Sequence, residues 1–334
     1  METERDIKLT SAELSGLWTT YMNDSMAIPV IDYYLKHTTD VEIKGVLESA
    51  KSVSKEHLIE ITSIFNNEKC PIPHGFSEDD VNLSAPQLFS ESFHLVYMYY
   101  MGKSGMEAYS MALSFAARHD ILELFKKYWM QSEKIMKHSL EILLSRGLFT
   151  RPPYMPMPQE VEYVKKKNYL NGWFGGKRPL NAVEATHVFG NMKTNEMGKT
   201  LITGFAQVAK SSQVREFFLR GKKISTKHTG IFSSLLQESD LPATMTADAT
   251  VLPSKESPFS DKLMMYHINS MISIGIGKYG LAMSVSMRHD LALQYGRLLA
   301  EIGTYAEDGA DIMIENSWME QPPQIPNYDD VNSK

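Results

Sequence analysis

The tripeptide Arg118-His119-Asp120 returns 170 residues later as Arg288-His289-Asp290, and both belong to a repeat that runs through the chain. Other positions return at the same spacing. They include His57 with His228, Pro71 with Pro242, Phe89-Ser90 with Phe259-Ser260, Tyr109 with Tyr279, and Pro152-Pro153 with Pro322-Pro323. The offset is 171 before the middle of each repeat and 170 after it, so one residue has been lost in a connecting loop. Such a long period predicts two copies of a whole domain rather than a solenoid of short units.

The composition is that of a globular protein. Of 334 residues, 43% are hydrophobic and 22% are charged, and the net charge of −6 argues against a general nucleic-acid binder. Cys70 is the only cysteine, which excludes an internal disulfide and suits a reducing compartment. The N-terminal residues lack the apolar run of a signal peptide, and no stretch approaches the length of a membrane span. We therefore expect a cytoplasmic protein.

Apolar residues recur at three- and four-residue spacing, which predicts amphipathic helices in both repeats. The predicted ranges are 10–38, 41–67, 86–114 and 119–147, then 181–209, 212–238, 257–284 and 289–317. Asp40 and Ser211 are suitable N-caps of the second helices, and Ser84 and Ser254 lie just ahead of the third ones. Gly147 is expected to end a helix, and Pro29 predicts a kink.

Loop lengths select the topology. Only a few residues join the first helix to the second and the third to the fourth, which predicts two antiparallel hairpins in each repeat. About 19 residues join the second helix to the third, enough to run the length of a bundle. The sequence thus predicts an all-α chain of two tandem ferritin-like four-helix bundles, each with one long crossover between helices two and three. The expected boundaries are 1–158 for the first bundle, 159–179 for a linker and 180–334 for the second bundle.

A ferritin-like bundle raises the question of a metal site built from inward-facing Glu and His residues. The candidate ligands are Glu13, Glu56, His57, Glu60, Glu184, His187 and His228. Glu184 and His187 have the Glu-x-x-His spacing, but they lie near the start of their helix. Neither repeat contains the full di-metal pattern, so no cofactor is predicted, and a divalent iron, manganese or zinc ion is the alternative.

His57 and His228 are notable because both repeats have a histidine in the middle of the second helix. One interpretation is a partly buried histidine that hydrogen-bonds across the bundle. The other is a mononuclear metal or small-ligand site that uses His57 with Glu13, Glu56 or Glu60. The Arg-His-Asp stretches are likewise open to two interpretations, a catalytic group or a cap with a salt bridge at a helix start. No G-x-S-x-G motif accompanies them, and no catalytic residue is predicted.

The sequence also resembles a known family. The stretches that carry this resemblance are Gly175-Gly176-Lys177-Arg178-Pro179-Leu180-Asn181-Ala182 with Glu184, Asn191-Met192-Lys193-Thr194-Asn195-Glu196, Arg288-His289-Asp290 and Trp318-Met319-Glu320-Gln321-Pro322-Pro323. They are similar to a duplicated family from spore-forming bacilli known only as domain of unknown function 3231 (DUF3231). That family is similar to the spore coat protein F group of the ferritin-like superfamily. The first repeat departs from the pattern at Leu148-Phe149-Thr150-Arg151.

The resemblance implies the bundle fold and a link to sporulation, but no established activity. We therefore expect a non-enzymatic structural or interaction protein on a degenerate ferritin-like scaffold. Its expected partners are proteins, with spore coat components as candidates, and the two bundles are expected to share an interface. The alternative is a metal- or small-ligand-binding protein, such as an oxidoreductase, with a site inside one or both bundles. The two hypotheses differ in whether the native protein contains stoichiometric metal.

Overall fold

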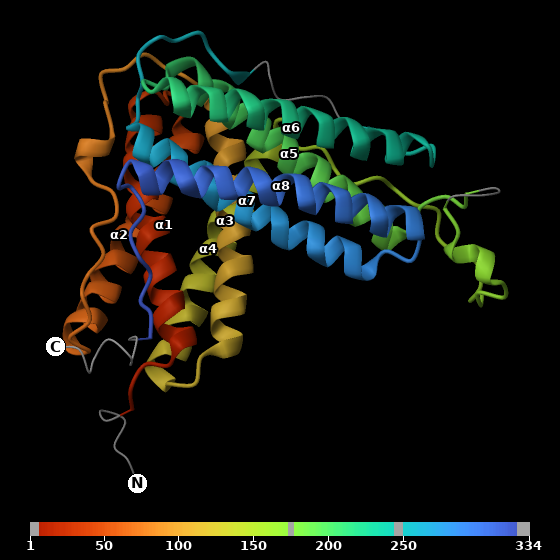
Figure 1. Cartoon of the computed structure of the whole chain (residues 1–334), viewed down its shortest axis with the longest axis horizontal. Coiled ribbons are helices and arrows are strands. Elements are labelled where there is room, and N and C mark those ends of the chain that lie inside the picture. Colours follow the sequence, from red (N-terminus) through yellow and green to blue (C-terminus); the bar gives the residue numbers. More distant parts are fainter. Residues whose placement is uncertain (1–6, 173–176, 244–249, 326–334) are drawn as a thin grey trace. The chain divides into compact units, whose positions relative to one another are not determined.

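The computed structural model describes residues 7–172, 177–243 and 250–325. Within these residues the chain is helical, and the pairing of Phe89 with Val251 is an isolated antiparallel bridge rather than a strand. Among the described residues the long helices run from α1 to α8 and follow the order of the two repeats (Figure 1). The all-α class and the two tandem helical bundles predicted from the sequence are confirmed. The ferritin-like relationship stays a prediction.

The first repeat forms α1 (Ser11–Lys36), α2 (Val41–Asn67), α3 (Glu91–Phe115) and α4 (His119–Ser145). The second repeat forms α5 (Ala182–Val208), α6 (Ser212–Gln237), α7 (Asp261–Val285) and α8 (His289–Glu315). Short 3-10 helices lie at Glu78–Asp80 and Lys167–Leu170. The predicted ends hold within two residues except at the starts of α3 and α7, which begin five and four residues later than predicted.

Hydrogen bonds just ahead of the third helices explain the late starts in both repeats. Backbone atoms of Leu88 and Ser90 hydrogen-bond to Leu252 and Thr250, which keeps the segment ahead of α3 extended. Ser260 caps α7 by accepting a hydrogen bond from the backbone N–H of Leu263. Ser84 and Ser254 therefore lie in the connections and do not cap the third helices.

Caps fix most of the other helix ends. Asp40 accepts hydrogen bonds from two N–H groups of α2, and Ser211 accepts one at the start of α6, as predicted. Gly147 has φ +66°, the left-handed conformation that ends a helix at low cost when no Cβ is present. The equivalent residue in the second repeat, Ser317, has φ +57°. Both fourth helices thus end in the same turn.

Cross-helix contacts confirm the predicted crossover in the first repeat. The carboxylate of Glu91, at the start of α3, accepts a hydrogen bond from the N–H of Asp40, at the start of α2. Arg118, at the start of α4, forms an ion pair with Glu68, at the end of α2. The third helix therefore starts beside the start of the second, so the connection must return along the bundle.

The second repeat has the same topology. Asp261, at the start of α7, accepts hydrogen bonds from the N–H groups of Lys210 and Ser211, just ahead of α6. Gln213, near the start of α6, donates to Glu315, at the end of α8. The helix starts and ends therefore meet as they do in the first repeat.

The chain folds into two compact units that do not coincide with a single cut in the sequence. Among the described residues, unit 1 contains 7–84, 91–148 and 319–325, and unit 2 contains 85–90, 149–172, 177–243 and 250–318. Each unit thus includes a short segment from the other repeat. The domain boundaries expected from the sequence stay a prediction.

Each unit has its own core. In unit 1, Leu17, Ile61 and Phe125 are fully buried around Tyr109 and Tyr128. In unit 2 the rings of Phe232, Tyr279 and Tyr295 pack with centroids 5.6, 5.7 and 5.9 Å apart. In the described part of the chain, no helix combines the length and apolarity needed to cross a lipid bilayer.

Candidate functional site: a histidine cluster in each bundle

His57 lies in the middle of α2 and is 1% exposed. Its Nδ1 is 2.9 Å from Oδ2 of Asp24 on α1, and its Nε2 is 2.9 Å from Oε1 of Gln131 on α4. Gln131 donates through its Nε2 to Glu56, which leaves its Oε1 facing the histidine. Both ring nitrogens therefore face acceptors, an arrangement that the doubly protonated imidazolium satisfies completely.

Buried aromatic rings surround this pair. The ring of Tyr128 stacks on His57 with centroids 3.5 Å apart, and Tyr109 meets it edge-on at 5.8 Å. Ser54 donates a 2.7 Å hydrogen bond to the second oxygen of Asp24. Burial, and after it the negative charge of Asp24, raises the pKa of Tyr109 well above its ordinary value. Tyr109 therefore stays neutral and cannot serve as a base at ordinary pH.

His228 occupies the equivalent place on α6 and is fully buried. Its Nδ1 is 2.9 Å from the hydroxyl of Tyr279 on α7, and its Nε2 is 3.1 Å from Oε2 of Glu301 on α8. Asn195 on α5 donates a 2.7 Å hydrogen bond to the same tyrosine hydroxyl. The Tyr279 hydroxyl can thus donate to Nδ1 of His228. A neutral imidazole ring with its proton on Nε2 then satisfies both Tyr279 and Glu301.

Desolvation by burial lowers the pKa of His228, against an opposing effect of Glu301. The pKa of Glu301 is lowered: burial raises it, but the hydrogen bonds from Lys227 and His228 lower it more. The neutral histidine is therefore paired with an ionised carboxylate that also contacts a lysine.

The carboxylate and the amide change places between the two clusters. Asp24 is replaced by Asn195 in the second repeat, and Gln131 is replaced by Glu301. Each cluster thus retains one histidine, one tyrosine, one amide and one carboxylate, but the carboxylate comes from the first helix in unit 1 and from the fourth in unit 2. The exchange is a difference that neither repeat alone reveals.

The four predicted metal ligands of the first repeat, all within the described residues, do not form one cluster. Glu56 and Glu60 both accept hydrogen bonds from Lys127, at 2.7 and 2.6 Å, on the partly exposed side of the bundle. Glu13 lies at the start of α1, where it forms a capping box with Thr10 and accepts from the N–H groups of Ala117 and Arg118. Burial raises the pKa of Glu13, but these hydrogen bonds outweigh it and lower that pKa to about 2.

The predicted ligands of the second repeat are likewise separate. Glu184 is fully buried at the start of α5, forms a two-point ion pair with Arg178, and accepts from the N–H of Arg288. His187 is partly exposed, and desolvation lowers its pKa. Among the described residues, no three His, Cys, Asp or Glu side chains lie together as a group that could hold a metal ion. The donors present do not fit the di-metal centre of a ferritin-like bundle, and metal binding stays a prediction.

The Arg-His-Asp stretches form salt bridges at the starts of the fourth helices, but the N-cap residues Arg118 and Arg288 make no side-chain cap hydrogen bond. Arg288 is 1% exposed and forms a two-point pair with Asp290. Arg118 pairs in the same way with Asp120, and with Glu68. His119 and His289 are exposed and take no part in these pairs. The arginines therefore tie the start of each fourth helix to its own first turn.

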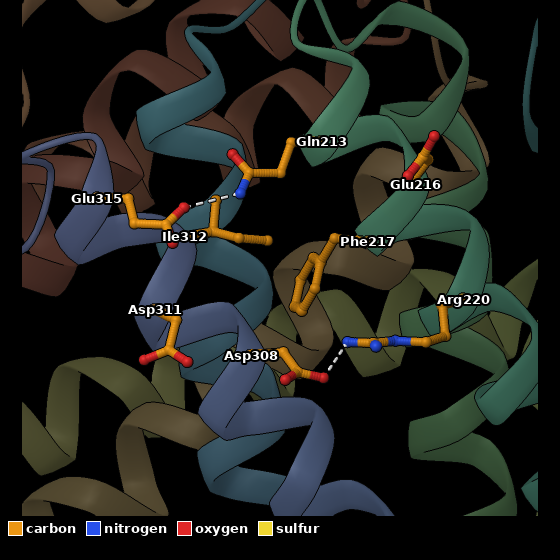
Figure 2. Close-up of a pocket in the computed structure, with 8 residues that line it drawn as sticks. All are labelled: Gln213, Glu216, Phe217, Arg220, Asp308, Asp311, Ile312 and Glu315. Carbon is orange, nitrogen blue, oxygen red and sulfur yellow. Dashed lines mark hydrogen bonds and ion pairs between the residues drawn. The ribbon is translucent and has the colours of Figure 1, made fainter.

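A shallow groove of about 410 Å³ runs between α6 and α8 in unit 2 (Figure 2). Figure 2 shows its charged rim, in which Arg220 pairs with Asp308 and Gln213 bonds Glu315 across the two helices. Phe217 forms the floor and stacks on Tyr305 with ring centroids 4.2 Å apart. These cross-helix pairs join α6 to α8, and the groove contains no catalytic pairing of a nucleophile with a base.

Asp24, Gln131 and Glu301 were not predicted as partners of the histidines, and Asn195 was not predicted as the partner of Tyr279. The three histidine partners lie 33 to 74 residues from their histidine along the chain, so helical spacing does not connect them. Aligning the two repeats could have found them. The exchange of Asp24 for Asn195 and of Gln131 for Glu301 is visible in the sequence once the offset is applied.

The comparisons with known proteins agree with the repeat. The model of a family described as "Protein of unknown function (DUF3231)" matches residues 2–161 and 168–331. A crystal structure of a "putative spore coat protein" from Bacillus halodurans C-125 is similar at 16% identity with a TM-score of 0.42. That match covers 46% of this chain and 100% of the solved one. No curated protein matches the chain. Since the family model covers each repeat in turn, the chain belongs to the DUF3231 family of proteins of unknown function.

Proposed function

We propose that this chain is a non-enzymatic structural or interaction protein. The observation that carries the proposal is the commitment of the central polar groups to one another. Both ring nitrogens of His57 and of His228 have protein partners within 3.1 Å. A metal ligand or a general base needs a lone pair that is free to face the ion or the substrate. These histidines instead join three helices of their bundle.

The distribution of the remaining carboxylates supports the same proposal. Glu56 and Glu60 neutralise Lys127, and Glu13 and Glu184 bind backbone N–H groups at helix starts. Each of these pairs stabilises the scaffold by satisfying a charge or an orphan N–H group. These contacts support a structural role for the acidic side chains that suggested a metal site.

The metal content of the native protein tests the proposal against its rival, a metal- or ligand-binding protein. We expect protein purified without chelators to contain well below one iron, manganese or zinc ion per chain. Calorimetric titration with the same three metals is expected to give no saturable binding. Stoichiometric metal that disappears in His57→Ala or His228→Ala would establish the rival function instead. The matched control is His119→Ala, which removes an exposed histidine.

We further propose the spore coat as the location, on the basis of the sequence resemblance to the spore coat protein F group. Mass spectrometry of purified and fractionated spores is the measurement. We expect the protein in the coat fraction. Its presence only in the cytosol of vegetative cells would contradict the location and would leave the structural role to be tested separately.

A further inference from the structure

A tight turn in the connection between α2 and α3 binds a carboxylate. Oε2 of Glu320 accepts a 2.9 Å hydrogen bond from the N–H of His74, and Oε1 accepts a 2.7 Å bond from the N–H of Gly75. All three residues belong to unit 1, although Glu320 follows the last helix of the second repeat. Two successive N–H groups aimed at one anion form a backbone nest.

Gly75 allows the backbone to adopt this turn. Its φ of +62° is left-handed, and a Cβ placed there would lie 2.4 Å from Oγ of Ser25 on α1. Ser25 in turn accepts a 3.3 Å hydrogen bond from the N–H of Phe76. The turn is therefore held against α1 with its N–H groups facing outward, independently of Glu320. Tyr21 lies close enough for the Glu320 charge, after burial, to raise the pKa of its hydroxyl.

Glu320 attaches its segment, residues 319–325, which we call the tail, to the turn through these two hydrogen bonds. Its side chain is 21% exposed, whereas Met319 and every described residue from Gln321 onward are exposed. The tail also leaves α8 through Ser317, whose φ of +57° is disfavoured for a residue with a Cβ. Because the other described tail residues are exposed, the tail can leave the turn without disturbing either helical core.

The first repeat offers no second acidic tail. The position equivalent to Glu320 in the first repeat is Thr150, which has no carboxylate to offer. Among the described residues, the acidic tail follows α8 and the acceptor turn lies in unit 1, while positions 245 and 246, the counterparts of His74 and Gly75, lie outside those residues. A donor and an acceptor on different surfaces give a heterologous contact, which closes into rings or continues into filaments when molecules exchange it.

We propose that the His74–Gly75 turn is a recognition site for the glutamate-bearing tail and that a second copy of this chain supplies the tail, so that molecules join by exchanging it. The inference rests on the proposed structural role and names its partner. Within one molecule the tether favours the molecule's own tail. Exchange between molecules then increases with protein concentration.

The first arm of the test measures recognition. A fluorescent peptide with the sequence of residues 316–325 is added to the full-length Glu320→Gln chain, whose own tail competes poorly. We expect saturable binding that weakens about tenfold or more when the peptide carries Gln in place of Glu, since a charge-assisted contact is lost. Equal binding of the two peptides, or no binding, would overturn the recognition site. Glu320 lies outside every helix, so the variant keeps both bundles, and circular dichroism checks this.

The second arm measures assembly by light scattering over a range of concentrations. We expect the mass of the wild-type chain to rise above the 37.9 kDa of one molecule as concentration increases. Glu320→Gln should stay at the mass of one chain, while Glu307→Gln, an exposed glutamate on α8, should behave as wild type. A wild type that stays monomeric, or a Glu320→Gln chain that assembles equally, would overturn the exchange. Metal content tests the proposed function separately, so the two failures are distinguishable.

Discussion

The two histidine clusters occupy the same place in their bundles but meet the same hydrogen-bonding demand in opposite ways. In unit 1 the carboxylate of Asp24 and the amide oxygen of Gln131 face the two ring nitrogens of His57. In unit 2 a tyrosine hydroxyl and the carboxylate of Glu301 face His228. The duplication preserved a satisfied buried network and not the identity of its members. Such a pattern is what a structural requirement preserves, because burial penalises an unpaired polar group whatever its type.

The clusters should therefore differ in how much they lose when the first-helix partner is removed. Asp24→Ala removes the carboxylate that faces the buried His57. We expect the unfolding free energy of unit 1 to fall by about 3–5 kcal/mol. Asn195→Ala removes only the amide that donates to Tyr279, and we expect unit 2 to lose about 1–3 kcal/mol. Urea unfolding followed by hydrogen exchange of peptides from each unit separates the two effects.

The control for this pair is Asp32→Ala on α1. Asp32 forms a partly exposed pair with Lys51, so its loss should cost about 0–1 kcal/mol. Equal losses of unfolding free energy in Asp24→Ala and Asn195→Ala would mean that the carboxylate and the amide stabilise their units equally. The expected difference between the clusters would then be wrong.

As pH falls, unit 2 should lose unfolding free energy before unit 1 does. His267 on α7 is 5% exposed, and burial lowers its pKa to about 4, whereas its counterpart in unit 1 is Tyr97, which carries no charge in acid. A histidine whose folded pKa lies below its unfolded value binds more protons when unfolded. Stability is therefore lost as pH falls from about 6.5 towards 4, by about 3 kcal/mol in total. The lowered pKa of His228 acts in the same direction.

Unit 1 should respond at lower pH through Glu13. Because the folded pKa of Glu13 is about 2, its contribution is complete above the unfolded value of 4.5 and is lost as pH falls from 4.5 towards 2. Urea midpoints of peptides from each unit, measured from pH 7 to pH 3, check both windows. His267→Phe should remove most of the response of unit 2 above pH 4.5. If unit 2 of this variant still loses stability over the same pH range, groups other than His267 cause the loss.

Transplanting one cluster into the other tests whether the exchange of acid and amide is compensating. Asp24→Asn with Gln131→Glu gives unit 1 the acid and amide arrangement of unit 2. We expect Asp24→Asn alone to destabilise unit 1 and the second change to recover about 1–2 kcal/mol, as coupled sites do. Thermal or urea unfolding of the two single variants and the double variant completes the cycle. Strict additivity would show that the two positions are independent.

The smallest effect should be the same in both units. Thr10 and Asn181 cap α1 and α5 through identical capping boxes with Glu13 and Glu184. Thr10→Ala and Asn181→Ala should each cost about 1 kcal/mol. Unfolding measured by circular dichroism at pH 7 checks this. A much larger loss for one of them would reveal an asymmetry at the helix starts that their shared geometry does not show.

Most of the architecture was predictable because helices and caps depend on local sequence. The apolar spacing, the caps Asp40 and Ser211 and the glycine at Gly147 are all set by residues within a few positions of each other. The late start of α3 was not predictable in this way. It depends on backbone bonds between Leu88 and Leu252, which are 164 residues apart.

The site was less predictable than the fold because its contacts join residues that are far apart in the sequence. The sequence by itself determined that two histidines lie at equivalent places in two helical bundles, because the repeat fixes the positions and the periodicity fixes the helices. Only the tertiary structure decided their partners and directed Glu56 and Glu60 to a lysine instead of a metal. It also brought Glu320 to Gly75, 245 residues away. Helical periodicity assigns each side chain to a face of its own helix, but the path of the chain decides what that face meets.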